Sequence, residues 1–235
     1  MVEYPSENWR DYALIDSGNG EKLERFGSYI MARPEPKALW TPSLSPEQWD
    51  AKMHTRFTPG AGFGKAGKED VGTWSKAKRM DEQWRIVYPG LQKGLRRDHR
   101  LALPSVKHVG VFPEQAPNWE FIFRQCSSLA DRAKAASVPA PKVLNLFAYT
   151  GGASLAARAA GADVTHLDSV RQVVNWARGN MDNSGMDGIR WVVEDAMKFA
   201  KREERRGHLY DGIILDPPAY GHGPDGERWK LDDCL

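Results

Sequence analysis

The apolar and polar positions of this 235-residue chain follow two different rhythms, and the change falls near Ala116 and Pro117. Before that point the apolar residues form short runs of strand-like composition, separated by segments rich in glycine, proline and asparagine. We expect these runs to form strands at residues 29–32, 84–88, 101–103 and 108–112. The pattern therefore predicts a β-rich, loop-heavy region over residues 1–117.

From residue 118 onward apolar runs alternate with segments of helical periodicity. Residues 118–137 place apolar side chains at helical spacings, which predicts an amphipathic helix. We then expect strands at 143–147, 163–167, 189–193 and 210–215, and helices at 153–160, 170–181 and 196–206. Strands separated by helices of this length form parallel βαβ units with right-handed crossovers. Residues 118–235 therefore predict an α/β fold with a doubly wound parallel sheet.

Four predicted strands precede Leu235, whereas a complete sheet of this type has about six. Either the domain is unusually short or the chain is part of a longer polypeptide. We expect the second, with a Rossmann-like sheet that is incomplete on its C-terminal side.

Composition narrows the class of protein. The chain is 41% hydrophobic and 27% charged, as in ordinary globular proteins. Its apolar runs are far shorter than the roughly 20 residues that span a bilayer, and its first residues do not resemble a secretory signal. Cys126 and Cys234 form neither a metal-binding nor a disulfide pattern. We expect a cytoplasmic protein without membrane or metal partners, and the oligomeric state stays open.

The net charge of +2 conceals a basic segment. Residues 60–107 contain eleven Lys and Arg against five Asp and Glu. This excess of positive charge is typical of a region that binds a polyanion, although a solvated lysine-rich surface is the alternative. Six of the nine tryptophans lie in or beside the N-terminal region, where they either fill a small core or stack on bases. A nucleic acid, RNA rather than DNA, is the expected partner.

Four loops follow the predicted strands and carry the candidate chemistry. Ligands of doubly wound sheets bind outside the carboxyl ends of the strands, at the point where the strand order reverses. The loops contain the paired glycines Gly151 and Gly152, then Asp168, then Asp195, and finally Asp216. Asp168 and Asp195, taken singly, could instead cap helices, but all four loops in order are more specific.

The first loop lacks the GxGxxG pattern of dinucleotide sites. A ligand that has a ribose and a carboxylate but no phosphate fits better, and S-adenosylmethionine is such a ligand. Asp168 could accept bonds from the ribose hydroxyls, and Asp195 could accept the adenine amine. Paired glycines would let the backbone approach the ligand, and amides that open the next helix could meet its carboxylate.

The fourth loop, Asp216-Pro217-Pro218-Ala219-Tyr220, follows the apolar run 212–215. A carboxylate, two prolines and an aromatic ring delivered by a buried strand could hold a flat ring, either amine-bearing or electron-rich, beside a reactive centre. The loop therefore indicates methyl transfer to a planar substrate.

These segments together resemble class I S-adenosylmethionine-dependent methyltransferases. The closest likeness is to bacterial large-subunit ribosomal RNA methyltransferases with an Asn-x-Phe-x-Tyr-Thr-Gly-Gly first motif, which stands here at 145–152. The resemblance covers residues 143–220, about a third of the chain. Residues 111–118 look like a variant of the hairpin that precedes the catalytic domain in that group, with Pro113-Glu114-Gln115 in place of Asp-Gln-Arg.

The resemblance implies a role for each site residue. The cofactor would be bound by Phe147, Tyr149, Thr150, Gly151, Asp168, Ser169, Asp195, Ala196 and Asp216. The catalytic group would be Asp216, Pro217, Pro218 and Tyr220.

The methylated atom stays open. For an exocyclic amine, Asp216 and a proline carbonyl would accept its protons and Tyr220 would stack on the ring. Methylation at carbon 5 of a pyrimidine requires a cysteine nucleophile. Ala219 separates the prolines from the aromatic ring, and Cys234 lies eighteen residues after Asp216. A base in RNA is the expected substrate, and a protein or small planar molecule is the alternative. A non-catalytic RNA- or cofactor-binding module is the third possibility.

Overall fold

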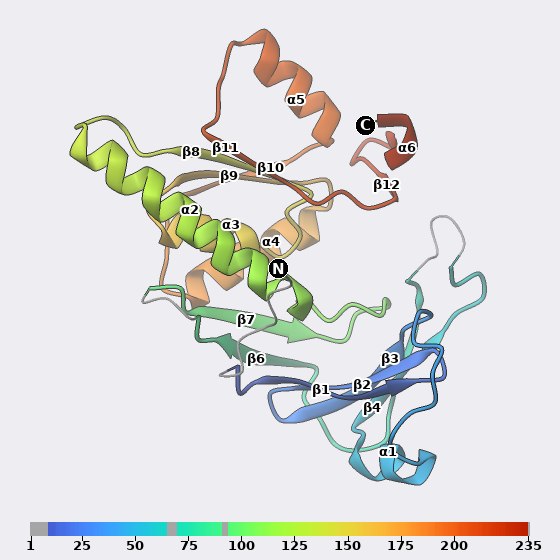
Figure 1. Cartoon of the computed structure of the whole chain (residues 1–235). Coiled ribbons are helices and arrows are strands. Elements are labelled where there is room, and N and C mark those ends of the chain that lie inside the picture. Colours follow the sequence, from blue (N-terminus) through green and yellow to red (C-terminus); the bar gives the residue numbers. More distant parts are fainter. Residues whose placement is uncertain (1–8, 65–69, 91–93, 235) are drawn as a thin grey trace. The chain divides into compact units, whose positions relative to one another are not determined.

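The computed structural model describes residues 9–64, 70–90 and 94–234, drawn as ribbon in Figure 1. The chain forms two compact units. The N-terminal unit contains Glu7–Tyr88 and His99–Pro113, and the C-terminal unit contains Pro89–Asp98 and Glu114–Leu235. None of the helices in the described ranges is long and apolar enough to cross a membrane.

The N-terminal unit contains a five-stranded sheet in chain order. Its strands are β1 (Tyr12–Gly18), β2 (Glu21–Phe26), β3 (Tyr29–Pro34), β4 (Thr55–Pro59) and β5 (Gly72–Lys76). All neighbours are antiparallel except β3 and β4, which are parallel and are connected through helix α1 (Pro46–Lys52). Ser45 caps α1 in a reciprocal bond pair with Gln48. A separate two-stranded sheet pairs β6 (Gln83–Tyr88) with β7 (Arg97–Ala102).

Helix α1 supplies an aromatic side chain to the core of this sheet. Trp49 packs with Leu23, Ala32 and Met53, and it is 4% exposed. Its indole N–H donates to Asp16 at 2.8 Å. The prediction that tryptophans fill a small core is thus confirmed at Trp49.

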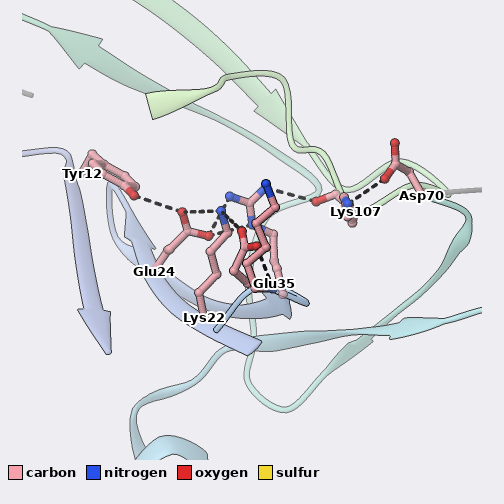
Figure 2. A network of polar contacts seen from close by, with 8 residues as sticks. Tyr12, Lys22, Glu24, Glu35, Asp70 and Lys107 are labelled. Carbon is pink, nitrogen blue, oxygen red and sulfur yellow. Dashed lines mark hydrogen bonds and ion pairs between the residues drawn. The ribbon is translucent and has the colours of Figure 1, made fainter. Parts of the chain in front are cut away.

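A polar network connects three strands of the sheet with two loops (Figure 2). Buried Glu24 accepts a hydrogen bond from the Tyr12 hydroxyl at 3.0 Å and forms a 2.6 Å ion pair with Arg33. Arg33 also donates to the carbonyl of Lys107 at 3.2 Å, and the Lys107 ammonium lies 2.8 Å from Asp70. The network therefore fixes the loops around Asp70 and Lys107 on the sheet.

Two expectations near the end of the N-terminal region are wrong. Residues 108–112 are not a strand, because Gly110 adopts φ 106° and the segment runs as a loop with Val109 and Val111 buried. Residues 111–118 are not a hairpin but a 3-10 turn, η1 (Pro113–Gln115), that leads into helix α2 (Ala116–Ala135). Pro113 and Pro117 have no amide hydrogens for a strand ladder, and a proline is tolerated in the first turn of a helix.

The C-terminal unit has a four-stranded parallel sheet in the order β10-β9-β8-β11. The strands are β8 (Lys142–Leu146), β9 (Asp163–Asp168), β10 (Ile189–Val193) and β11 (Gly212–Leu215). The helices after α2 are α3 (Gly152–Ala159), α4 (Arg171–Asn183) and α5 (Ala196–Arg205). A hairpin of β12 (Tyr220–His222) and β13 (Arg228–Lys230) then leads to α6 (Leu231–Cys234).

The predicted α/β doubly wound fold is confirmed, and each predicted element of this unit lies within two residues of the observed one. The strand order matches the first four strands of doubly wound sheets, so the order reverses between β8 and β11.

Side chains alternate between the two faces of β8. Leu144 and Leu146 pack with Leu167 and with Phe199 of α5. Asn145, which lies between them in sequence, instead donates to Ser154 of α3 at 2.9 Å. Because successive side chains of a strand point to opposite faces, α5 covers one face of the sheet and α3 the other, as Figure 1 shows.

Candidate functional site

The loop after β8 has an unusual backbone. Phe147, Tyr149 and Gly151 all have positive φ, at 56°, 49° and 91°. Non-glycine residues in this region cost on the order of 1 kcal/mol or more each, so neighbouring groups must hold the loop in place. Asn180 of α4 does so by donating to the carbonyl of Thr150 at 3.0 Å. The loop predicted to bind a ligand is therefore strained, and a hydrogen bond from α4 holds it.

The two glycines of this loop are required by packing within the protein. A Cβ on Gly152 would lie 2.7 Å from the indole ring of Trp119, which is buried on α2. A Cβ on Gly151 would lie 3.2 Å from Ala177, in addition to the strain of its positive φ. From the sequence we expected a ligand to approach the backbone at the paired glycines. Beside Gly152, the side chain of Trp119 occupies that space instead.

Asp168 ends β9 and contacts two loops. Its Oδ2 accepts from the backbone amide of Tyr149 at 2.9 Å, and its Oδ1 accepts from the amide of Val170 at 2.9 Å. Burial raises the pKa of this carboxyl group, although the backbone hydrogen bonds act in the opposite direction. The N-cap of α4 is Val170 and not Asp168. Ser169, which follows, is half-buried.

Asp195 is the N-cap of α5, as the capping alternative expected. Its carboxylate accepts from the amide of Lys198 at 2.8 Å, and the residue is 9% exposed. Ala196 begins the helix and is buried. The neighbouring Glu194 forms a 2.6 Å ion pair with Arg202. Capping uses Oδ1 of Asp195, and a carboxylate has further lone pairs for another donor.

Asp216 follows β11 and contacts the start of α2. Its Oδ2 accepts a hydrogen bond from Nε2 of Gln115 at 3.0 Å, and Oε1 of Gln115 accepts one from Asn118 at 2.7 Å. Pro217 is half-buried and Pro218 is exposed.

The β12–β13 hairpin closes on this loop through Trp229. The indole N–H of Trp229 donates to the Pro218 carbonyl at 2.6 Å, and its ring lies 4.6 Å from the ring of Phe147. Tyr220, at the start of β12, pairs with Lys230 across the hairpin. The carbonyl oxygen of Pro218 thus already accepts one hydrogen bond from within the protein.

Three of the predicted loops, those after β8, β9 and β11, are connected by contacts at the carboxyl ends of their strands. Asp168 contacts the loop after β8, and Trp229 connects that loop with the one after β11. Sequence reasoning missed the contributions of Gln115, Trp119 and Trp229, which come from α2 and the hairpin. The spacing of Gln115 and Asn118 at a helix start is the only local signal of their contact.

The donors and acceptors at the carboxyl ends of these strands fit S-adenosylmethionine. None of the described side chains caps the start of α3, so its first amides can meet a carboxylate. Asp168 and Asp195 stand at the ends of successive strands, where they can accept bonds from a ribose and an amine. No cluster of metal-ligating side chains occurs in the described ranges.

The fold is a doubly wound α/β unit, and comparison with known proteins identifies its family. A family model described as S-adenosylmethionine-dependent methyltransferase matches residues 74–225. The crystal structure of an S-adenosylmethionine-dependent methyltransferase from Agrobacterium tumefaciens is 41% identical with a TM-score of 0.81, over 99% of this chain and 68% of that one. The chain belongs to the S-adenosylmethionine-dependent methyltransferase family.

Shorter similarities extend to curated enzymes. The chain is 33% identical over 82 residues to ribosomal RNA large subunit methyltransferase I of Klebsiella pneumoniae, which is 34% of this chain and 20% of that protein. It is 34% identical over 97 residues to ribosomal RNA large subunit methyltransferase K/L of Shewanella frigidimarina, which is 40% of this chain and 13% of that protein. The matches thus span a fifth or less of these relatives.

Proposed function

We propose that this chain is the cofactor-binding part of a methyltransferase that transfers a methyl group from S-adenosylmethionine to a base in RNA, with ribosomal RNA favoured. The observation that carries the proposal is the placement of the two acids: Asp168 ends β9 and is bonded to the loop after β8, and Asp216 follows β11, the strand on the other side of β8. The curated relatives named as ribosomal RNA methyltransferases support the choice of RNA.

Three groups would hold the cofactor. The amides that open α3 would meet its carboxylate, Asp168 its ribose hydroxyls, and Asp195 its adenine amine. The methyl sulfonium supplies an electrophilic carbon, so the main task of the protein is to align the acceptor atom with it. The loop of Phe147, Tyr149 and Gly151 suits that task because hydrogen bonds from its neighbours hold it.

The acceptor would lie beside Asp216. One carboxylate oxygen would accept an N–H of the base, and the Pro217 carbonyl is a second candidate acceptor because Pro218 is bound to Trp229. Cys126 is buried on α2, and burial raises the pKa of its thiol, which disfavours the thiolate that pyrimidine methylation at carbon 5 requires.

The N-terminal unit would contact the RNA. Lys78, Arg79 and Arg85 are exposed there. The Trp40 indole is 58% exposed and is fixed by a 2.8 Å bond to the carbonyl of Ser17, so its face could stack on a base.

The basic segment is smaller on the surface than its composition suggests. Arg97 is only 1% exposed, Lys107 is paired with Asp70, and Lys76 lies 3.7 Å from Glu82. Lys65, Lys68 and Lys93 lie outside the described residues. The proposed RNA contact therefore rests on fewer cations than the count of eleven.

Salt titration tests the RNA contact. Each neutralised phosphate contributes a slope of about −0.7 to the plot of log affinity against log salt for single strands. The double variant R79Q/R85Q should flatten this slope, whereas Lys134→Gln, at an exposed position late in α2, should leave it unchanged. Equal slopes for all three proteins would exclude Arg79 and Arg85 from the contact, and a flat slope for wild type would favour a neutral small-molecule substrate.

A further inference from the structure

Helix α2 begins beside the proposed acceptor site. Gln115 is its N-cap residue, but its side chain makes no capping bond to the helix. Instead its Nε2 donates to Asp216 Oδ2 at 3.0 Å, across 101 positions of sequence. Gln115 therefore bonds to the loop after β11 and not to its own helix end. This makes it a candidate for a role in that loop.

The orientation of this amide is fixed by a second bond. Asn118 donates to Oε1 of Gln115 at 2.7 Å, so the Nε2 side of the amide faces Asp216. If the amide were flipped, Oε1 would face a carboxylate, and two acceptors cannot bond to each other.

The start of α2 is itself anchored to the cofactor loop. The indole ring of Trp119 fills the space beside Gly152, where α3 begins. Gln115 and Trp119 are four positions apart, so both lie on one side of the first turn of the helix. The same turn thus contacts the loop after β8 through Trp119 and the loop after β11 through Gln115.

We propose that Gln115 is a positioning residue for methyl transfer, held by Asn118, which fixes the Asp216 carboxylate so that Oδ1 points to the acceptor nitrogen. This inference rests on the proposed function of Asp216. Within the described part of the chain Oδ2 is bonded to Gln115, whereas Oδ1 has no hydrogen-bond partner. One oxygen is therefore fixed by the protein, and the other is open to an N–H of the substrate.

The test is a double-mutant cycle on methyl transfer. The proteins are wild type, Gln115→Ala, Asp216→Asn and the double variant, assayed with labelled S-adenosylmethionine and large-subunit ribosomal RNA transcribed in vitro. Gln115→Ala should lower kcat on the order of tenfold or more, because a misplaced group slows a reaction that depends on alignment, while cofactor affinity stays unchanged. In the Asp216→Asn background, Gln115→Ala should lower kcat hardly any further.

Two controls separate positioning from folding. Gln125→Ala changes an exposed glutamine later on α2 and should leave kcat unchanged. Asn118→Ala frees the Gln115 amide to rotate and should give a smaller loss of kcat with no change in the midpoint of urea unfolding.

The outcomes distinguish the two proposals. If the kcat loss of the double variant equals the product of the two single losses, Gln115 does not act through Asp216. That result, or a fall in cofactor affinity equal to the fall in kcat, would overturn the role of Gln115 and leave that of Asp216. Wild-type activity of Asp216→Asn would overturn the assignment of Asp216 and this inference with it.

Discussion

The carboxylate of Asp168 accepts a hydrogen bond from the backbone amide of Tyr149 at 2.9 Å. An acid at the end of β9 thereby fixes the loop that follows β8, which contains three residues with positive φ. The residue proposed to bind the ribose is thus also the residue that shapes the neighbouring part of the site. Changes at Asp168 should accordingly affect both loop geometry and cofactor binding.

We expect Asp168→Ala to weaken S-adenosylmethionine binding by roughly 1–3 kcal/mol, the usual cost of leaving polar partners unpaired. Isothermal titration calorimetry measures this directly. Asp182→Ala, which changes an exposed acid in α4, is the matched control and should bind as wild type does. Unchanged affinity in Asp168→Ala would remove Asp168 from the cofactor site.

Two glycines of the C-terminal unit should respond oppositely to alanine. Gly152→Ala would place a methyl group 2.7 Å from the Trp119 ring, so we expect a loss of about 1–3 kcal/mol in the free energy of unfolding. Gly179 lies inside α4 with nothing within 4 Å of its added Cβ, so alanine should gain up to about 1 kcal/mol through helix propensity. Urea unfolding of both variants checks the pair, and a Gly152→Ala protein as stable as wild type would contradict the packing role of Trp119.

A buried polar chain connects β8, α3 and β9. Asn145 donates to Ser154 Oγ at 2.9 Å, and Ser154 Oγ lies 2.9 Å from Nδ1 of His166. Burial lowers the pKa of His166 to about 3, so the ring is neutral at ordinary pH and can accept from Ser154. Ser154→Ala should cost roughly 1–3 kcal/mol of unfolding free energy because it leaves two buried groups without this partner.

Ser128→Ala, at an exposed position of α2, is the control for that change. Its unfolding midpoint in urea should match wild type. A Ser154→Ala variant that also matched wild type would show that the buried chain contributes no net stability.

Asp70 should make the N-terminal unit sensitive to acid. Burial alone would raise the pKa of Asp70, but hydrogen bonds from His108 and Lys107 outweigh it and lower the pKa to about 2. The stabilisation by its ionised form is therefore complete above the unfolded pKa of about 3.9 and is lost as the pH falls through about 2.

Comparison with Asp70→Asn isolates this contribution. Because the carboxylate is 34% exposed, solvent screening limits its contribution to about 1 kcal/mol near pH 7. The difference in unfolding free energy between wild type and Asp70→Asn should shrink below pH 4, as measured by urea unfolding at several pH values. A difference that stayed constant from pH 7 to pH 3 would contradict the lowered pKa.

Sequence alone predicted the parallel sheet well because each strand and helix of the C-terminal unit has its own local periodicity. It failed at 108–112, where an apolar run is buried as a loop around Gly110. It also missed Gln115 and Trp229, because their contacts with Asp216 and Pro218 depend on how the loops converge and not on any local pattern.

The explanation of the paired glycines also needed the structure. Glycine next to glycine is equally expected where a ligand approaches and where a side chain fills the space. Only the position of Trp119 assigns Gly152 to packing. Asp195 was ambiguous for a similar reason, since an acid that caps α5 and an acid that binds an amine occupy the same position at the end of a strand.

The central claim is methyl transfer to an RNA base, and mass analysis of nucleosides tests it most directly. Large-subunit ribosomal RNA transcribed in vitro is incubated with S-adenosylmethionine and either wild type or Asp216→Ala, then digested to nucleosides. We predict one methylated nucleoside with wild type and none with Asp216→Ala. Wild-type protein that binds S-adenosylmethionine but leaves every nucleoside of this RNA unmethylated would contradict the claim.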